Sequence, residues 1–322
     1  MKVAIITGIS GQDGIYLSKL LINKGYKLIG TTRSCELFDY SNFNSIGVKK
    51  SDLIIEELDL MVMSNIVSLI IKYKPDEIYN FAAQSSVSKS FEDSIGTFSF
   101  NTNSVNNLLE SIKLTKPNTK FYQASSSEMY GESDSLPIKI STPMRPISPY
   151  AVSKVASYFM VKTYRDSYNI FASNGVLFNH ESPFRASNFF TKKIINSAFL
   201  IKEGKQKFLE VGNLHIKRDF GDAKKYVEAI WKLMQQDKPM DLIICSGQSI
   251  LLKEVVEYVF KKLDINLNLI TINQEFFRPN EIFDIYGDNS DAKKILDWDY
   301  DCTFFQVLDI LIDDEINKRS LN

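Results

Sequence analysis

The chain has 322 residues, 44% of them hydrophobic, so it can form one large domain or two lobes around a substantial core. Its 38 Lys and Arg residues nearly balance its 39 Asp and Glu residues, which leaves a formal net charge of -1. This balance argues against a nucleic acid or an anionic membrane as partner. No stretch approaches the roughly 18 apolar residues of a membrane-spanning helix, and the first apolar run is too short for a signal peptide. We therefore expect a soluble, cytoplasmic protein.

Cysteine and histidine content argues against a metal site. Cys35, Cys245 and Cys302 lie too far apart for zinc-ligand spacing or a disulfide framework. His180 and His215 are too few for a histidine-rich site. We therefore expect no bound metal.

Short apolar runs alternate with helical patterns through the first part of the chain. The predicted strands are Val3–Ile6, Lys27–Thr31, Leu53–Glu57, Glu77–Phe81, Phe121–Ser125 and Phe171–Phe178. The predicted helices are Asp13–Lys24, Ser64–Lys72, Thr102–Leu114 and Pro149–Tyr168, the last with Ser148 as N-cap. This order predicts an α/β fold, a doubly wound parallel sheet of the Rossmann type.

After Phe178 the alternation breaks, and aromatic residues and loops become more frequent. One more helix and one more strand are expected at Asp222–Gln236 and Asp241–Cys245. We expect residues 1–179 and about 217–246 to form a nucleotide-binding lobe. Residues from about 180–216 and 247–322 would then form a smaller, interleaved lobe for the substrate.

A glycine-rich turn, Gly8-Ile9-Ser10-Gly11-Gln12-Asp13-Gly14, follows the first predicted strand and opens the first helix. Glycine allows a tight turn and a close approach of the backbone to a pyrophosphate. The N-terminus of the helix adds free N–H groups that attract a negative charge. In this position the turn predicts dinucleotide binding, and the alternative is a plain tight turn.

The ends of the second and third strands bear on the choice of dinucleotide. Thr32 is followed by Arg33 and not by the carboxylate that would hold the ribose 2′-hydroxyl of NAD. A guanidinium there can pair with the 2′-phosphate of NADP, so we predict NADP, with a solvated surface arginine as the alternative. Asp59 suits the adenine amino group or, equally, a turn.

The chemical centre is predicted where Ala124–Gly131 follows a strand and Ser148–Lys154 begins a helix. Tyr150 and Lys154 stand four residues apart, so they share one helix face. That face lies roughly opposite an apolar stripe of Val152, Val155, Ala156, Phe159 and Met160, so we expect the pair to point away from the main packing surface. An ammonium beside Tyr150 would lower the pKa of the phenol toward neutrality and make it a general base. The alternative is an ordinary exposed pair.

The glycine turn and the Tyr-x-x-x-Lys pattern resemble those of the extended short-chain dehydrogenase/reductase superfamily. Within it, the chain is most similar to the GDP-mannose 4,6-dehydratase family. The resemblance covers nearly the whole chain and is carried by Gly11–Gly14, Ala82–Ser85, Ser127–Gly131, Leu177–Pro183, Lys217–Asp219 and Arg278–Glu281. The string Asn-His-Glu-Ser-Pro at residues 179–183 is specific.

Carried over residue by residue, this resemblance implies a bound NADP and a GDP-sugar substrate. Besides the glycine turn, Arg33, Tyr150 and Lys154, it implies dinucleotide contacts at Asp59, Leu60, Ala83, Gln84, Ser85, His180 and Arg185. It implies nucleotide-sugar contacts at Ser85, Asn179, Lys193, Asn213, Arg218, Arg278 and Glu281. Taken alone, His180 reads as a structural histidine and Arg218 or Arg278 as a surface ion pair.

The resemblance also implies a mechanism. Tyr150 takes the proton of the sugar 4-hydroxyl during oxidation at C4, and Glu128 then takes the C5 proton and helps the 6-hydroxyl leave as water. Ser126 and Ser127 hydrogen-bond near O4 and O6, and Lys154 holds the nicotinamide ribose. Ser126 stands where the family has threonine.

Several alternatives stay open at this point. A nucleotide-sugar 4-epimerase or reductase needs Tyr150 and Lys154 but no carboxylate at position 128, and a non-catalytic NADP-sensing protein needs neither. The sugar is mannose or N-acetylglucosamine. The family implies a homodimer or homotetramer, but the segment after Thr32 lacks the longer arginine- and serine-rich stretch typical of the tetramer, and the doubled arginine after Pro183 is here Phe184-Arg185.

Overall fold

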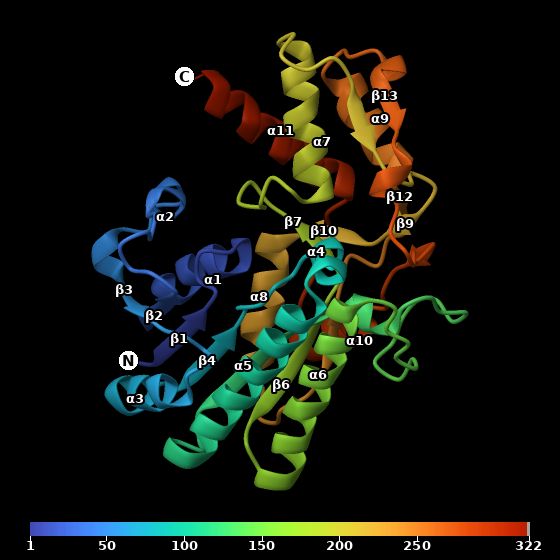
Figure 1. Cartoon of the computed structure of the whole chain (residues 1–322). Coiled ribbons are helices and arrows are strands. Elements are labelled where there is room, and N and C mark those ends of the chain that lie inside the picture. The colour runs from blue at the N-terminus through green and yellow to red at the C-terminus, as the bar shows by residue number, and fades with distance from the viewer. Residues whose placement is uncertain (321–322) are drawn as a thin grey trace.

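The computed structural model describes residues 1–320. Its largest element is a seven-stranded sheet in the order β11-β6-β5-β4-β1-β2-β3, in which all neighbours run parallel (Figure 1). The strands are β1 Val3–Thr7, β2 Lys27–Thr32, β3 Leu53–Glu57, β4 Glu77–Asn80, β5 Lys120–Ser126, β6 Ala172–Leu177 and β11 Leu242–Ile244. The predicted doubly wound α/β fold is confirmed.

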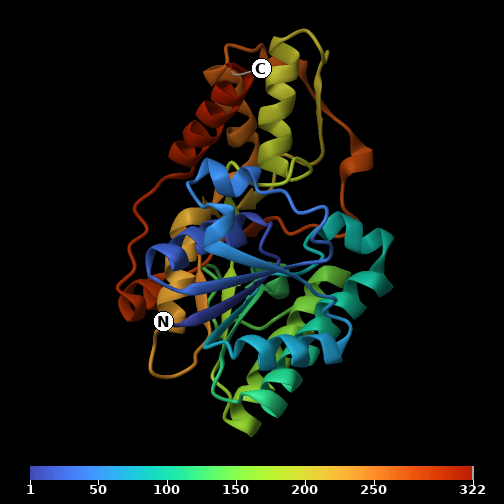
Figure 2. The ribbon, with the colours of Figure 1, turned by 90° about the vertical axis from the view of Figure 1, so that its left-hand side faces the viewer.

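Central strands of this sheet are covered on both faces. Every residue of β4 and β6 is buried, as expected for parallel strands with helices on each side. Helices α3 (Met63–Tyr73), α5 (Ser94–Thr115) and α6 (Pro149–Tyr168) cover one face. Helices α1 (Gln12–Asn23), α8 (Ala223–Met234) and α10 (Ser290–Leu296) cover the other (Figure 2).

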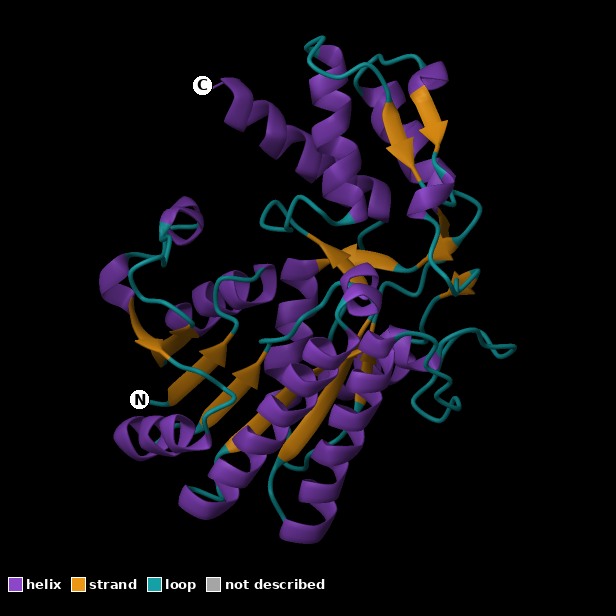
Figure 3. Ribbon diagram, viewed as in Figure 1, coloured by secondary structure: helices purple, strands orange, loops and turns teal. Residues whose placement is uncertain are grey.

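A second hydrophobic core lies beyond the carboxyl ends of the strands (Figure 3). It is built by α7 (Phe190–Lys202), α9 (Leu252–Lys262) and α11 (Phe304–Ser320), with β8 (Leu209–Val211) paired to β13 (Ile270–Ile272). Small sheets join the two cores: β7 (Asn179–Glu181) pairs with β10 (Phe220–Asp222), and β9 (Lys217–Arg218) lies between β12 (Ile250–Leu251) and β14 (Asp284–Ile285). The exact lobe boundaries stay a prediction.

Helix α5 is longer than predicted. It begins at Ser94 and not at Thr102, and the short helices α2 (Ser41–Ser45) and α4 (Val87–Glu92) were not predicted. The side chain of Asp93 caps α5 by accepting a hydrogen bond from the Gly96 N–H at 2.9 Å. The first turns contain glycine, serine and asparagine, whose weak helix propensity hid this start.

Helix α6 begins as predicted, with Ser148 capping the Ala151 N–H at 3.1 Å, but its orientation was predicted wrongly. Val152 and Phe159 of the apolar stripe are 43% and 50% exposed, whereas Tyr150 and Lys154 are 7% and 4% exposed. The buried face of α6 is polar and is paired with Asn101 of α5. The Asn101 side chain donates to Ser153 Oγ, and Ser157 Oγ donates to the Asn101 carbonyl oxygen, both at 2.9 Å. Small hydrogen-bonded side chains let the two helices approach closely, and this contact outweighs the apolar periodicity.

Within residues 1–320, no helix is long and apolar enough to cross a membrane. The cytoplasmic location stays a prediction.

Candidate active site

A single large cleft brings most of the predicted site residues together. It lies at the carboxyl ends of the central strands, where ligands bind in open α/β sheets. Its main-sheet wall comes from the glycine turn, the segment after β4, the end of β5 and the start of α6. The opposite wall comes from residues 179–193, 212–218 and 275–281.

The glycine turn is so tight that two of its glycines could not carry a side chain. Gly8 has a φ of +67°, and a Cβ there would lie 2.8 Å from the Ala82 nitrogen. A Cβ on Gly14 would lie 2.4 Å from the Ile9 carbonyl oxygen. Helix α1 has Gly11 as its N-cap residue, no side chain caps it, and the turn lines the cleft. The uncapped N–H groups therefore face the cleft and fit a dinucleotide phosphate.

His180 links the glycine turn to the strand opposite. Its Nε2 lies 2.9 Å from Asp13 Oδ1, and its Nδ1 lies 2.7 Å from the Phe178 carbonyl oxygen. Burial opposes the charged imidazolium, but the Asp13 carboxylate outweighs burial, and the pKa of His180 is raised. Gln12 donates to the His180 carbonyl oxygen at 2.9 Å. These contacts fix the turn at the floor of the cleft.

Tyr150 and Lys154 both line the cleft, but Lys154 does not lower the pKa of the Tyr150 phenol. Burial raises the pKa of Tyr150 to about 12, although a hydrogen bond with Ser126 opposes the rise. Burial lowers the pKa of Lys154 to about 8. The ammonium donates to the Ala124 carbonyl oxygen at 2.8 Å and lies 5.8 Å from the Tyr150 ring centroid. The predicted fall of the Tyr150 pKa toward neutrality is therefore wrong for the chain alone.

Glu128 follows β5 in a short 3₁₀ turn, Ser127–Tyr130. Its backbone N–H donates to Ser126 Oγ at 3.3 Å, so the hydroxyl of Ser126 orders the turn. Ser126 and Glu128 line the cleft beside Tyr150, whereas Ser127, only 5% exposed, is not among the described lining residues.

Two arginines face these groups from the opposite wall. Arg278 Nη1 lies 3.8 Å from Glu128 Oε1 and 3.8 Å from Glu281 Oε1. Arg218 donates to Glu281 Oε1 at 3.0 Å and is 5% exposed. Burial lowers the pKa of Arg218. Two guanidinium groups at one side of a cleft fit a diphosphate, because their N–H donors match its oxygen atoms.

Other predicted contacts also line the cleft: Ala83, Ser85, Asn179, Arg185, Lys193 and Asn213. Lys193 Nζ donates to the Glu210 carbonyl oxygen at 3.1 Å and lies 4.3 Å from the Phe276 ring centroid. Arg185 lies 3.7 Å over the Phe189 ring, and its buried Nε makes no hydrogen bond but lies 3.6 Å from Glu181 Oε1 in an ion pair.

Four predicted dinucleotide contacts do not line this cleft within residues 1–320: Arg33, Asp59, Leu60 and Gln84. Arg33 is exposed at the end of β2. Asp59 accepts from the Met61 N–H at 2.9 Å, which is the turn role weighed from the sequence. Gln84 donates to Thr97 Oγ1 at 2.9 Å, so its side chain points to α5.

Sequence reasoning missed an aromatic rim. The phenylalanine residues that line the cleft are Phe81, Phe91, Phe178, Phe184, Phe189, Phe190, Phe220, Phe276 and Phe277. Most belong to loops, where no periodicity marks them, and only the high aromatic content after Phe178 could have indicated them. Among residues 1–320, no group of three His, Cys, Asp or Glu side chains could hold a metal ion.

The parallel sheet, the glycine turn and the Tyr150–Lys154 pair define an extended short-chain dehydrogenase/reductase. The sequence model of the family described as GDP-mannose 4,6 dehydratase matches residues 5–311. This chain belongs to the GDP-mannose 4,6-dehydratase family, as the sequence motifs indicated.

Curated relatives agree with this membership. GDP-mannose 4,6 dehydratase 2 of Arabidopsis thaliana is 39% identical over 325 residues, covering 98% of this chain and 87% of the relative. GDP-mannose 4,6-dehydratase of Vibrio cholerae is 38% identical over 331 residues, covering 92% and 89%.

Solved structures share the fold at lower identity. The dTDP-glucose 4,6-dehydratase of Bacillus anthracis in complex with NAD superposes with a TM-score of 0.86 at 20% identity, covering 99% of this chain and 98% of that one. RMD from Pseudomonas aeruginosa complexed with NADPH has a TM-score of 0.83 at 23% identity, covering 99% and 100%.

Proposed function

We propose that this chain uses NADP to convert a GDP-hexose into the GDP-4-keto-6-deoxy sugar and water. Family membership supports GDP-sugar 4,6-dehydration as the activity. The observation that carries it is the carboxylate of Glu128 in the same cleft as Tyr150 and Lys154. A 4-epimerase or reductase needs no carboxylate at this place, and a non-catalytic sensor needs none of the three.

We assign the proton transfers of this reaction to Tyr150 and Glu128. A nicotinamide bound beside Tyr150 and Lys154 would supply the redox chemistry, as hydride acceptor at C4 and hydride donor at C6 of the sugar. Tyr150 accepts the proton of the 4-hydroxyl, and the ammonium of Lys154 stabilises the tyrosinate. The new C4 ketone acidifies the C5–H, and Glu128 takes that proton. Glu128 passes that proton to the leaving 6-hydroxyl, so that water departs. As C6 gains the hydride, Glu128 returns a proton taken from solvent to C5, and Tyr150 releases the proton of the 4-hydroxyl to solvent.

We assign the remaining cleft residues to binding. The uncapped end of α1 would hold the dinucleotide pyrophosphate, and Arg218 and Arg278 would hold the diphosphate of the GDP-sugar. Ser126 lies near Tyr150, where it would hydrogen-bond to O4 of the sugar. Ser127 is assigned to the sugar only through the family resemblance.

The choice of NADP over NAD rests on Arg33 at the end of β2, where no carboxylate follows Thr32. A guanidinium favours the 2′-phosphate of NADP. Relatives named for GDP-mannose support mannose as the sugar, with N-acetylglucosamine as the second candidate.

The activity is tested by incubating the protein with GDP-mannose and, separately, with GDP-N-acetylglucosamine. Mass spectrometry of the nucleotide sugar should show the loss of one water from one of the two. Epimerised or reduced products without water loss would contradict the proposal.

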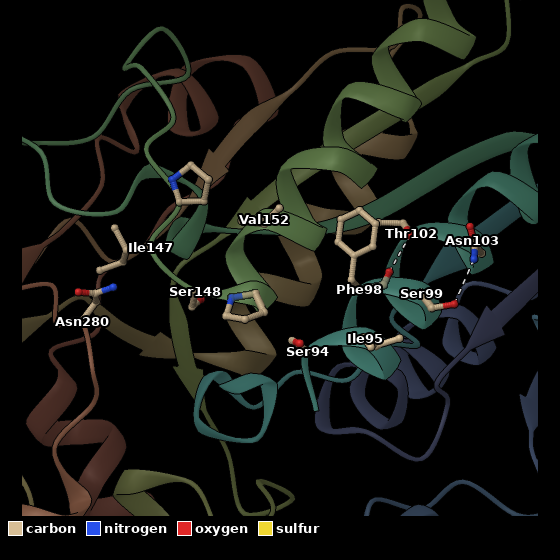
Figure 4. Close-up of a pocket in the computed structure, with 12 residues that line it drawn as sticks. Ser94, Ile95, Phe98, Ser99, Thr102, Asn103, Ile147, Ser148, Val152 and Asn280 are labelled. Carbon is tan, nitrogen blue, oxygen red and sulfur yellow. Dashed lines mark hydrogen bonds between the residues drawn. The ribbon is translucent and has the colours of Figure 1, made fainter. Parts of the chain in front are cut away.

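We also propose a homodimer formed through α5 and α6. Figure 4 shows Ile95, Phe98 and Val152 beside an open groove between these helices. The three side chains are 83%, 44% and 43% exposed, and Phe159 of α6 is 50% exposed. Helices that are buried on one face and apolar on the other need a second covering surface, which a second copy would supply. Light scattering should give the dimer mass, and a monomer at working concentration would contradict this assignment.

A further inference from the structure

Asp219, directly after Arg218, is a buried carboxylate that binds two separate segments of the chain. It is 1% exposed. Its Oδ1 accepts from the N–H and the Oγ of Ser246, at 2.9 and 2.6 Å. Its Oδ2 accepts from the N–H groups of Gly247 and Gly287, at 2.9 and 3.3 Å. The carboxylate thus accepts four hydrogen bonds, three from backbone N–H groups and one from a side-chain hydroxyl.

The two segments that Asp219 binds belong to different sheets. Ser246 and Gly247 follow β11, an edge strand of the main sheet, whereas Gly287 follows β14 of the small sheet. The Asp219 N–H donates to the Ile285 carbonyl oxygen at 3.1 Å. Asp219 therefore joins the small sheet, which carries Arg218, to the main sheet, which carries the chemical groups.

Arg218 is held by the same part of the small sheet. Its Nη1 donates to the carbonyl oxygens of Ile282 and Lys217, at 2.7 and 2.8 Å. Its Nη2 donates to Glu281, which lies three residues before β14. Movement of the β9–β14 pair relative to β11 would therefore move the whole guanidinium relative to Tyr150.

We propose that Asp219 is a positioning residue, which sets the distance between the diphosphate-binding Arg218 and the reacting groups on the main sheet. The proposal rests on the proposed function, because it needs a substrate that bridges the two walls. Catalytic geometry is sensitive to shifts of about 1 Å, so a rigid link between the walls has a direct effect on binding and rate.

A purely structural role explains the carboxylate less well. Burial raises the pKa of Asp219 to about 6, so keeping an anion here is costly. An apolar side chain could fill the space without that cost, but it could not bind four donors from two segments.

The test compares Asp219→Asn with a matched control, Asp241→Asn. Asp241 immediately precedes β11 and accepts hydrogen bonds from Arg165 with both oxygens at 2.8 Å. It is thus a second carboxylate held near β11, at the end opposite to Ser246 and Gly247. It is not among the described residues that line the cleft. The measurements are the melting temperature, the Kd for GDP by calorimetry, the Kd for NADPH by fluorescence, and kcat and KM for GDP-mannose.

For Asp219→Asn we expect the Kd for GDP and the KM to rise by about tenfold or more, while the Kd for NADPH stays within about twofold of wild type. Asp241→Asn should lower the melting temperature and leave the Kd for GDP unchanged. Ser246→Ala removes one donor to Asp219 and should raise the Kd for GDP by a few fold, which gives a readout even if Asp219→Asn does not fold.

Two results would overturn the proposal. One is an Asp219→Asn variant that loses thermal stability, as the Asp241→Asn control does, but binds GDP like the wild type. The other is an unchanged Kd for GDP in Ser246→Ala. Failure of the wild-type protein itself to bind GDP would instead contradict the proposed function, and the positioning role with it.

Discussion

Lys154 donates a hydrogen bond to the Ala124 carbonyl oxygen at 2.8 Å and so connects α6 to β5 at the floor of the cleft. Lys154 is only 4% exposed, and the structure gives its ammonium no carboxylate partner among residues 1–320. A buried cation without an anion is unfavourable for folding. The chain therefore holds a destabilising charge at the place where the chemistry needs it.

Replacing this lysine should stabilise the cofactor-free protein. Burial lowers the pKa of Lys154 to about 8 from 10.5, so below about pH 8 the folded state carries a charge that burial disfavours. Lys154→Met should raise the free energy of unfolding near pH 7 by up to about 3 kcal/mol and abolish turnover. Gln123 also donates to the Ala124 oxygen, at 3.0 Å, so that acceptor stays paired.

The difference in free energy of unfolding between Lys154→Met and the wild type should decrease as the pH rises. Between about pH 8 and 10.5, Lys154 is neutral in the folded state and charged in the unfolded state, so raising the pH stabilises the wild type relative to the variant. Urea unfolding near pH 7 and pH 9.5 should therefore give a difference that shrinks at the higher pH. A Lys154→Met variant less stable than wild type near pH 7 would contradict this account.

Ser126 should tune the general base. Its hydrogen bond opposes the burial that raises the pKa of Tyr150, so Ser126→Ala should raise that pKa further. We expect kcat to fall by about tenfold or more and the rising limb of the pH–rate profile to move to higher pH. Ser126→Thr keeps the hydroxyl and serves as the control, with a profile close to wild type. An unshifted profile in Ser126→Ala would show that the hydroxyl does not act on Tyr150.

Arg33→Ala tests the cofactor preference. A charge-assisted contact to the 2′-phosphate contributes about 1.5–3 kcal/mol, and NAD lacks that group. The variant should therefore lose affinity for NADP by at least tenfold and keep its affinity for NAD. Lys50→Ala, an exposed cation of the following segment, is the control. Equal losses for both dinucleotides in a fluorescence titration would argue against Arg33 as the selective residue.

Much of the site followed from the sequence because parallel strands end at one edge of a sheet. The glycine turn after β1, Ser126 and Glu128 after β5, and Tyr150 at the start of α6 could all be expected to meet there. Arg218 and Arg278 could not be assigned in this way, because they lie in a small sheet and a loop with no periodic pattern. Only the family motifs indicated them.

Side-chain directions were the part that sequence could not predict. The buried face of α6 depends on Asn101 of another helix, which donates a hydrogen bond to Ser153 and accepts one from Ser157, and no local pattern encodes these contacts. Gln84 lies in a predicted cofactor motif, yet its side chain binds Thr97 of α5. The partner of Lys154 is a backbone oxygen, which residue identity cannot indicate.

The role of Glu128 separates a dehydratase from the other activities of this fold. Glu128→Gln keeps the size of the side chain but cannot accept a proton, so water loss should fall by roughly a hundredfold or more while oxidation at C4 still occurs. The variant should bind GDP and NADPH like the wild type and show NADPH absorbance without product release. Glu132→Gln, at an exposed carboxylate after the same turn, is the control and should dehydrate normally.

The most direct measurement is the turnover of GDP-mannose in deuterated water, with the product examined by NMR and mass spectrometry. The wild-type protein should place deuterium at C5 of the 4-keto-6-deoxy product, because the original C5 proton leaves with the water and C5 then receives a solvent-derived deuteron through Glu128. Glu128→Gln should form almost none of this product. A product without deuterium at C5, or near-normal dehydration by Glu128→Gln, would contradict the assignment of Glu128 as the C5 base.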